Sequence, residues 1–263
     1  MTLNDHPATD TGWPEIDHLA PTISVDPRPF DGWYVWGKVV ADYLLALAIL
    51  VVALPLIGIC WVVVKATSAG PGFYSQTRLG RNGKAYPIYK LRSMTVNAEV
   101  AGAQWAQKVD CRVTRVGKFL RASHFDELPQ LFNVLFGQMS LVGPRPERPE
   151  MIRNKGLDVH VPGYRHRLLV RPGVTGLAQL QVAADTDLDS VRHKVVYDLF
   201  YIQNASFWFD LRILAATAFK AAGLRPKWLR RLFFLPHRDR VAETFRGNLA
   251  TTREDALGRL QPA

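Results

Sequence analysis

Two adjacent carboxylates, Asp126 and Glu127, are the side chains in this sequence best placed to do chemistry. They lie within 123–147, with Arg121 upstream and Arg145, in a Pro-Arg-Pro turn, downstream. Carboxylates beside arginines can bind a divalent cation together with phosphate oxygens, so both acids are candidate metal ligands. A carboxylate can also attack phosphorus and carry the transferred group covalently. The pattern is therefore typical of a phosphate site.

A plainer explanation of the acid pair is also open. Pro129 and the apolar residues after it predict a helix over 128–136 that stops at Gly137. Because the N-terminus of a helix favours negative charge, Asp126 and Glu127 could serve only to cap this helix. The residues alone allow both explanations.

Basic residues reach the acid pair from two other parts of the chain. Lys90 and Arg92 stand at the end of an apolar strand, where their cations could hold a phosphate. The run 112–121 then brings further cations close to the acid pair in sequence, among them Arg112 and Arg121. We interpret these four residues as candidate phosphate ligands.

The composition favours anionic partners. The 263 residues carry a formal net charge of +10 and have a pI near 9.8, which suits phosphates, nucleotides, nucleic acid or anionic lipid. A hydrophobic content of 48% excludes a mostly disordered chain. The two cysteines, Cys60 and Cys111, have no spacing suited to zinc and indicate no disulfide framework.

An uncharged apolar segment over 43–64 is long enough to cross the roughly 30 Å core of a bilayer as a helix. Pro55, at its middle, removes a backbone hydrogen bond and predicts a bend or break. Two geometries follow from hydropathy: a kinked span, or a re-entrant helix that returns to the same face. The basic body stays cytoplasmic in both, by the positive-inside rule.

The rest of the pattern predicts a mainly helical α/β domain with a small hairpin. Asn82-Gly83 between two aromatic and apolar runs predicts the hairpin. Helical spacing predicts helices over 187–203 and 206–222, and the basic and aromatic run that follows suits a membrane interface. We expect an acidic mobile tail over 1–37, a membrane helix over 38–66, a catalytic domain over 67–222 with a connecting helix and loop over 97–110, and a basic, then polar, tail over 223–263.

Four linked motifs resemble a known family. They are Y-K-L-R-S-M (89–94), T-R-V-G-K-F-L-R (114–121), the stretch from D-E-L-P-Q to P-R-P-E (126–147) and V-R-P-G-V-T-G-L-A-Q (170–179). Together, over about 38–220, they resemble the bacterial sugar transferases, the monotopic polyprenyl-phosphate phosphoglycosyl transferases that initiate exopolysaccharide, capsule or O-antigen assembly.

The resemblance implies transfer of a sugar 1-phosphate from a nucleotide diphosphate sugar, usually a UDP-sugar, to polyprenyl phosphate. It implies Asp126 as the nucleophile, Glu127 as a Mg²⁺ ligand and Arg145 as a phosphate contact, with Arg171 and Gln179 near the donor. It also favours the re-entrant membrane helix, at the cytoplasmic face of the bacterial inner membrane. The sugar and the oligomeric state stay open, a homodimer included.

Two other functions compete with this one. A basic, membrane-anchored binding module for nucleic acid or another anionic polymer would explain the charge. It would not explain the acid pair, because acids weaken a phosphate-binding surface, so we expect no nucleic-acid partner. Metal-dependent nucleotidyl hydrolysis is the third possibility, and it would need no polyprenyl acceptor.

Overall fold

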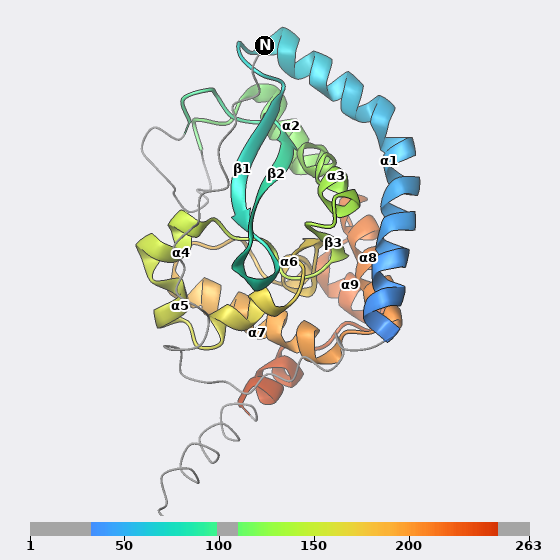
Figure 1. Cartoon of the computed structure of the whole chain (residues 1–263), viewed down its shortest axis with the longest axis vertical. Helices are drawn as coiled ribbons and strands as arrows, with labels where there is room; N and C mark the ends of the chain where they lie inside the picture. The colour runs from blue at the N-terminus through green and yellow to red at the C-terminus, as the bar shows by residue number, and fades with distance from the viewer. Residues whose placement is uncertain (1–32, 99–109, 247–263) are drawn as a thin grey trace, which may run out of the picture.

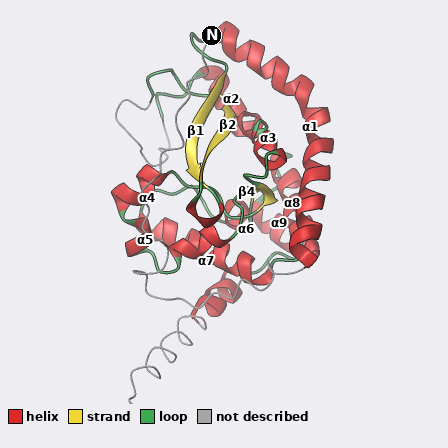
Figure 2. Ribbon diagram, in the orientation of Figure 1, coloured by secondary structure: helices red, strands yellow, loops and turns green. Residues whose placement is uncertain are grey.

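The computed structural model describes residues 33–98 and 110–246, which form a mostly helical α/β fold with two small sheets (Figure 2). The predicted fold class agrees with this arrangement. The predicted acidic tail up to residue 32, most of the connecting segment, at 99–109, and the end of the polar tail from 247 lie outside the described residues.

Helix α1, Trp33–Thr67, runs along one side of the molecule (Figure 1). With 35 residues it is about 50 Å long. Most of its surface carries exposed Leu, Val and Ile side chains. Its buried residues recur every three or four positions and form a single stripe that packs on the rest of the fold: Asp42, Ala46, Leu50, Ala53, Ile57, Cys60 and Val64.

Pro55 lies inside α1 without interrupting it. Because proline removes one backbone hydrogen bond and crowds the preceding turn, it bends a helix, and Figure 1 shows α1 curving around the other elements. The expected break into two helices is not observed, since α1 is continuous. By length and composition alone, α1 could cross a membrane.

Strands β1, Phe73–Leu79, and β2, Ala85–Leu91, pair antiparallel along their whole length. Asn82 (φ 56°) and Gly83 (φ 73°) both adopt the left-handed conformation that an Asn-Gly hairpin turn requires. The predicted hairpin is therefore confirmed. Lys90 lies near the end of β2, at the opposite end of the hairpin from its turn.

The acid pair lies between two short helices. Helix α2, Arg115–Ser123, ends at His124, whose left-handed conformation (φ 59°) turns the chain sharply. The 3-10 turn η3, Phe125–Glu127, follows at once, and helix α3, Gln130–Leu135, begins three residues after Glu127. The chain then turns at Gly137, which has a positive φ of 71°. The helix predicted over 128–136 is thus present but shorter.

Strand β3, Ser140–Val142, pairs in parallel with β4, Gly173–Thr175. A Cβ atom on Gly143 would lie 2.6 Å from the carbonyl oxygen of Arg171, so only glycine lets the two chains cross this closely. The connection between the strands contains α4, Pro149–Lys155, α5, Leu157–His160, and the 3-10 segment η4, Tyr164–Leu169.

Four helices complete the fold: α6, Leu177–Gln181, α7, Leu188–Asn204, α8, Phe207–Ala221, and α9, Pro226–Leu232. Helices α7 and α8 lie within one residue of the two predicted helices and begin at side-chain caps, Asp187 and Ser206. Residues 238–246 are also helical, and Val241 is buried. This part of the predicted C-terminal tail therefore packs on the domain.

A buried polar cluster fixes the start of α1 to the domain. Lys38 Nζ lies 2.6 Å from Asp210 Oδ2 on α8 and 3.4 Å from Asp42. Tyr201 OH, on α7, donates to Asp210 at 2.8 Å, and Ser140 Oγ, on β3, donates to Asp42 at 2.6 Å. Because buried charges need such partners, these contacts determine how α1 sits against β3, α7 and α8.

Candidate active site

Glu127 is at the centre of the site because it joins three segments that are distant in sequence. Its Oε1 accepts a hydrogen bond from Lys90 Nζ, on β2, at 2.7 Å and another from Arg145 Nη2 at 2.7 Å. Arg145 Nη1 also contacts Oε2, at 3.4 Å. The structure thus brings together three of the predicted site residues, from β2, η3 and the Pro-Arg-Pro turn.

Asp126 lies beside this cluster with 6% of its surface exposed. Within the described part of the chain its carboxylate accepts no hydrogen bond, so both oxygens are free for a ligand. Burial raises the pKa of the Asp126 carboxyl, Lys90 opposes that shift, and the neighbouring Glu127 carboxylate adds to it. A raised pKa makes the ionised carboxylate a stronger base and a better nucleophile.

The pKa of Glu127 moves the other way. Burial would raise it, but Arg145 and Lys90 together hold the pKa of this carboxyl well below its usual range. Burial lowers the pKa of the Lys90 ammonium, although Glu127 opposes the shift. Glu127 raises the pKa of the Arg145 guanidinium. Two adjacent carboxylates in such different environments are suited to different roles.

The structure does not support the capping explanation of the acid pair. Neither η3 nor α3 has a side chain that caps its N-terminal N–H groups. The Glu127 carboxylate is instead committed to Lys90 and Arg145. The acids therefore belong to a cluster of charges rather than to a helix end.

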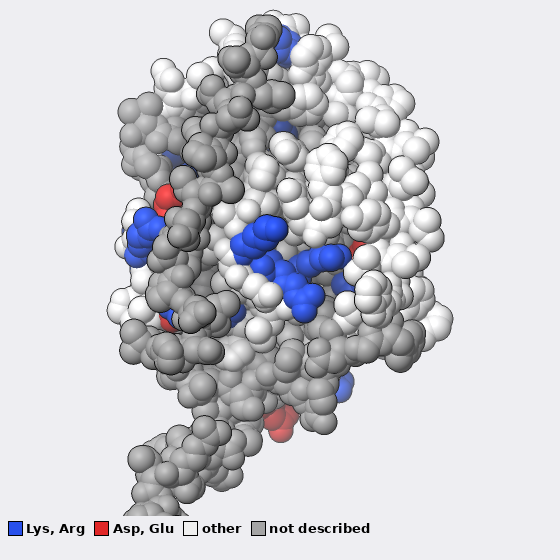
Figure 3. Space-filling view, in the orientation of Figure 1, with Lys and Arg blue, Asp and Glu red and all other residues white. Residues whose placement is uncertain are grey.

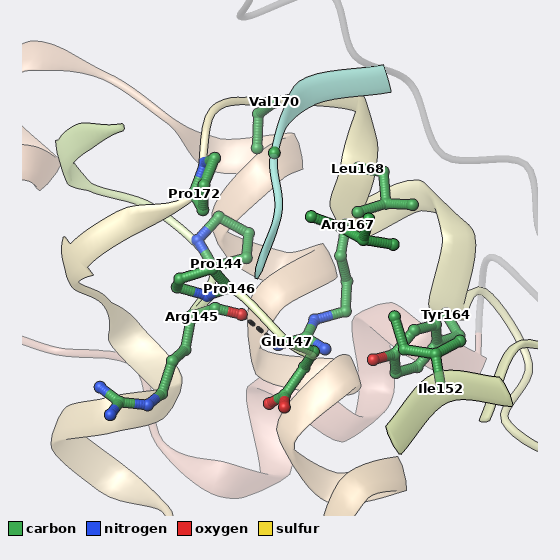
Figure 4. A pocket seen from close by; sticks show the side chains of 12 residues that line it. Pro144, Arg145, Pro146, Glu147, Ile152, Tyr164, Arg167, Leu168, Val170 and Pro172 are labelled. Carbon is green, nitrogen blue, oxygen red and sulfur yellow. Dashed lines mark hydrogen bonds between the residues drawn. The ribbon is translucent and has the colours of Figure 1, made fainter. Parts of the chain in front are cut away.

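Hydrogen bonds to its three backbone carbonyl oxygens fix the Pro-Arg-Pro turn, 144–146, to neighbouring segments. In order along the turn, these accept hydrogen bonds from Gly173 N–H at 2.9 Å, Arg167 Nη2 at 3.1 Å and Arg78 Nη1 at 3.2 Å. Arg167 in turn pairs with buried Asp198 at 2.7 Å. Figure 4 shows the Arg167 bond and the Arg145 side chain extending to the other side of the turn.

A small pocket lies behind the turn (Figure 4). With about 10 Å³ it has room for one water molecule and not for a sugar nucleotide. Its lining is largely apolar: Leu79, Gly80, Pro144, Arg145, Pro146, Glu147, Ile152, Tyr164, Arg167, Leu168, Val170 and Pro172. The acid pair, on the side to which Arg145 points, is therefore the better candidate for the active site.

Arg121 lies next to Asp126, whereas Arg112 and one nitrogen of Arg92 bind other residues. Arg92 Nε and Nη1 are buried without a hydrogen-bond partner among the described residues. Arg121 donates to Ser93 Oγ at 2.9 Å, and its charge lowers the pKa of Asp126. Arg92 Nη2 donates to the carbonyl and hydroxyl oxygens of Ser68, at 2.8 and 2.7 Å, in the loop after α1. Arg112 forms a two-pronged ion pair with Asp110, at 2.8 and 2.7 Å.

The two residues predicted to lie near the donor are at the β4 end of the site. Arg171 is half-buried just before β4. The side-chain amide of Gln179, on α6, donates to the carbonyl of Val174 at 3.0 Å. Among the described residues, neither side chain is hydrogen-bonded to the acid pair.

Several supporting residues were not predicted from the sequence. Asn133, inside the apolar run 131–136, bonds to the backbone of β2. Arg78, Arg167 and Asp198 hold the Pro-Arg-Pro turn. A polar residue inside an apolar run was the sequence signal that could have identified Asn133. Arg167 and Asp198 are 31 residues apart, and no sequence pattern predicts that they pair.

On the face of the molecule drawn in Figure 3, most of the charged side chains in view are basic. Lys and Arg side chains gather near its middle, over the turn end of the β1–β2 hairpin, and few acidic side chains share that surface. A concentration of positive charge of this kind attracts anionic ligands.

A profile of the protein family described as "Bacterial sugar transferase" matches residues 33–223. The chain belongs to the bacterial sugar transferase family. The match extends from the start of α1 to the end of α8, so it includes the long apolar helix, the acid pair and the Pro-Arg-Pro turn.

Named relatives agree with this membership. The chain is 42% identical over 211 residues to a UDP-N-acetylgalactosamine-undecaprenyl-phosphate N-acetylgalactosaminephosphotransferase of Aeromonas hydrophila, covering 80% of this chain and 49% of the relative. It is 38% identical over 224 residues to a UDP-glucose:undecaprenyl-phosphate glucose-1-phosphate transferase of Caulobacter vibrioides, covering 82% and 79%. It is 39% identical over 192 residues to an undecaprenyl-phosphate galactose phosphotransferase of Salmonella typhimurium, covering 67% and 38%. The chain thus spans about half or less of several relatives.

The first prediction concerns the stability of the Glu127 cluster. Glu127→Gln keeps the shape of the side chain but leaves the mostly buried Lys90 and the one-third exposed Arg145 without a carboxylate. This should cost about 3 kcal/mol of unfolding free energy at pH 7, the low end for a buried pair because solvent screens Arg145. The pKa of Glu127 is lower in the folded protein than in the unfolded chain. The stabilisation is therefore fully present when the pH is above the pKa of the unfolded chain, and it is lost as the pH falls through the pKa of the folded protein. Denaturant unfolding of both proteins across pH measures it.

The matched control is Glu150→Gln, which removes a half-exposed carboxylate 3.7 Å from Arg148. This change should alter the unfolding free energy by less than about 0.5 kcal/mol. Equal stability of Glu127→Gln and the unmodified protein at pH 7 would contradict the cluster as described.

Proposed function

We propose that this chain transfers a sugar 1-phosphate from a nucleotide diphosphate sugar to polyprenyl phosphate, and that Asp126 carries the group between the two. The observation that supports this best is the buried Asp126 carboxylate, which accepts no hydrogen bond from the described residues and lies beside Lys90, Arg121 and Arg145. The three relatives are named as undecaprenyl-phosphate sugar phosphotransferases, which fits the same reaction.

The proposed reaction has two balanced steps. In the first, an Asp126 oxygen attacks the phosphorus that bears the sugar, and the bond to the nucleoside monophosphate breaks, so that this product leaves with the electron pair. In the second, an oxygen of the acceptor phosphate attacks the same phosphorus, and the acyl phosphate bond breaks and restores the Asp126 carboxylate. The same anion-binding site then serves both steps.

The residues around Asp126 have separate roles in this proposal. Donor and acceptor are both anionic, so positive charge must approach before a carboxylate can reach phosphorus. Lys90 and Arg145, oriented by Glu127, and Arg121, oriented by Ser93, supply that charge. Glu127 stays ionised and keeps the two cations in place.

Mg²⁺ fits the same site if protein carboxylates and substrate phosphates together coordinate it. Among the described residues, no three His, Cys, Asp or Glu side chains could hold a metal ion alone. Mg²⁺ at phosphate sites usually takes one or two carboxylates together with substrate phosphates. Asp126 and the less engaged Oε2 of Glu127 would supply them. When bound, the ion neutralises phosphate charge.

The identity of the sugar is not part of the proposal. The three relatives named above act, by their names, on N-acetylgalactosamine, glucose and galactose derivatives. Two of these names specify a UDP-linked donor, which favours a UDP-sugar here.

We also propose that the domain sits on the cytoplasmic face of the membrane and that α1, although continuous and bent rather than broken at Pro55, enters the membrane with both of its ends at that face. The buried stripe of α1 extends from Asp42 to Val64, so the domain packs along most of the helix, whereas a simple span would leave that length to lipid. Helices α8 and α9 and the turn after α9 add highly exposed aromatic side chains, and Lys and Arg occur in the same segments, which suits the headgroup region: Phe207, Trp208, Trp228 and Phe234.

The reaction is tested by release of nucleoside monophosphate from a panel of UDP-, GDP- and dTDP-sugars with polyprenyl phosphate and Mg²⁺. We expect release from one donor that requires the acceptor for multiple turnovers and that falls at least about 1,000-fold in Asp126→Asn and Asp126→Ala. Sustained release without acceptor would favour nucleotidyl hydrolysis. No release from any donor would favour the anionic-polymer binding module.

The topology is tested with a membrane-impermeant maleimide in a Cys60→Ser, Cys111→Ser background. Single cysteines at Trp36 and Thr67, near the two ends of α1, should both react in inverted membrane vesicles and stay unlabelled in intact cells. Exposed Cys111, restored alone, is the cytoplasmic control. Labelling of either α1 position from outside the cell would show a span.

A further inference from the structure

Asn133 is a fully buried amide in α3, with 0% of its surface exposed. Its Oδ1 accepts a hydrogen bond from the Tyr89 N–H at 3.1 Å. Its Nδ2 donates to the Pro87 carbonyl and to Gln138 Oε1, both at 2.7 Å. The amide therefore uses both of its donors and its acceptor, which fixes its orientation.

These contacts lie on the free edge of β2. The other edge of β2 pairs with β1, so the Tyr89 N–H and the Pro87 carbonyl point away from the hairpin. The Asn133 amide stands where the peptide group of a third strand would pair. Pro87 suits this edge because it has no N–H to leave unpaired there. Asn133 thus holds the middle of β2 against α3.

The η3–α3 segment contacts β2 a second time, six residues earlier. Glu127 accepts the hydrogen bond from Lys90 Nζ at 2.7 Å, and Lys90 follows Tyr89 directly. One short stretch of chain therefore holds both the backbone of β2 and the ammonium beside it. A shift of β2 along α3 would move the two contacts together.

We infer that Asn133 is a positioning residue for the transfer reaction: it sets β2 so that the Lys90 ammonium meets Glu127 at the edge of the Asp126 site. This inference rests on the proposed function. A lysine side chain is flexible and does not orient itself, so its placement depends on the strand that carries it. Misplacing such a group by about 1 Å can cost about 100-fold in rate.

A double-mutant cycle with Lys90 distinguishes positioning from general support of the fold. Asn133→Ser removes the clamp and leaves space for a water molecule. We expect it to lower kcat/KM for the donor by about 10- to 100-fold in the unmodified protein. In a Lys90→Met background the same change should alter kcat/KM by less than about twofold, because the group it positions is absent. The same loss in both backgrounds would overturn the inference.

A second readout does not depend on activity. Lys90→Met should lower the unfolding midpoint less in the Asn133→Ser background than in the unmodified protein, because the Lys90–Glu127 contact is already weakened there. Thr217→Val is the control background, since it removes a partly buried contact between β4 and α8, Thr217 Oγ1 to Thr175 Oγ1 at 2.7 Å. There the shift caused by Lys90→Met should be unchanged. Equal shifts in all three backgrounds would refute the positioning role even if no donor is found.

A milder variant covers the case in which Asn133→Ser does not fold. Gln138→Leu removes one acceptor of the Asn133 amide and leaves the contacts to β2 in place. We expect a smaller loss of the same sign, again absent in the Lys90→Met background. A loss that is additive with Lys90→Met would count against the inference. A fully active set of Asn133 variants beside an inactive Asp126→Asn would refute it while sustaining the proposed function.

Discussion

The ion pairs of the Glu127 carboxylate, which is largely but not fully buried between Lys90 and Arg145, are the interaction on which the rest of the site depends. A buried charge is tolerated only when its partners are close and well oriented, so this one carboxylate requires the 3-10 turn, β2 and the Pro-Arg-Pro turn to meet. Each partner is fixed in its own way. Asn133 holds β2, while Arg167 and Gly173 hold the turn. Much of the surrounding fold can be understood as support for these contacts.

The two acids differ because the carboxylate of Glu127 has hydrogen-bond partners within the described residues, whereas that of Asp126 has none. Glu127 receives two cations at 2.7 Å, so it remains ionised and cannot easily attack a substrate. Asp126, its neighbour in sequence, is buried without a hydrogen bond from the described residues, and its pKa is raised. Adjacent positions on a tight 3-10 turn point in different directions, which allows the two environments to differ within one residue. Division of labour between paired carboxylates is a common feature of active sites.

Local signals in the sequence predicted the local structure well. The Asn82-Gly83 turn, the α7 and α8 helices and the acid pair follow from turn chemistry, helical periodicity and charge spacing. The contacts between segments could not be predicted in this way. Arg92 and Arg112 looked equivalent to Lys90 and Arg121 as phosphate ligands, but Ser68 binds one nitrogen of Arg92 and Asp110 pairs with Arg112. Sequence spacing also does not show that Arg167 reaches Asp198, or that the helix continues across Pro55.

The most direct test of the central proposal is the intact-protein mass of the enzyme mixed with its donor and Mg²⁺ in the absence of acceptor, quenched in acid within seconds. Covalent transfer to Asp126 predicts a gain of one sugar phosphate group per chain, with one equivalent of nucleoside monophosphate released, and loss of the adduct when polyprenyl phosphate is added before the quench. Asp126→Asn should gain nothing, and Lys90→Met should gain the adduct more slowly. An adduct on Asp126→Asn, or turnover by the unmodified enzyme with no adduct at any time, would contradict Asp126 as the nucleophile.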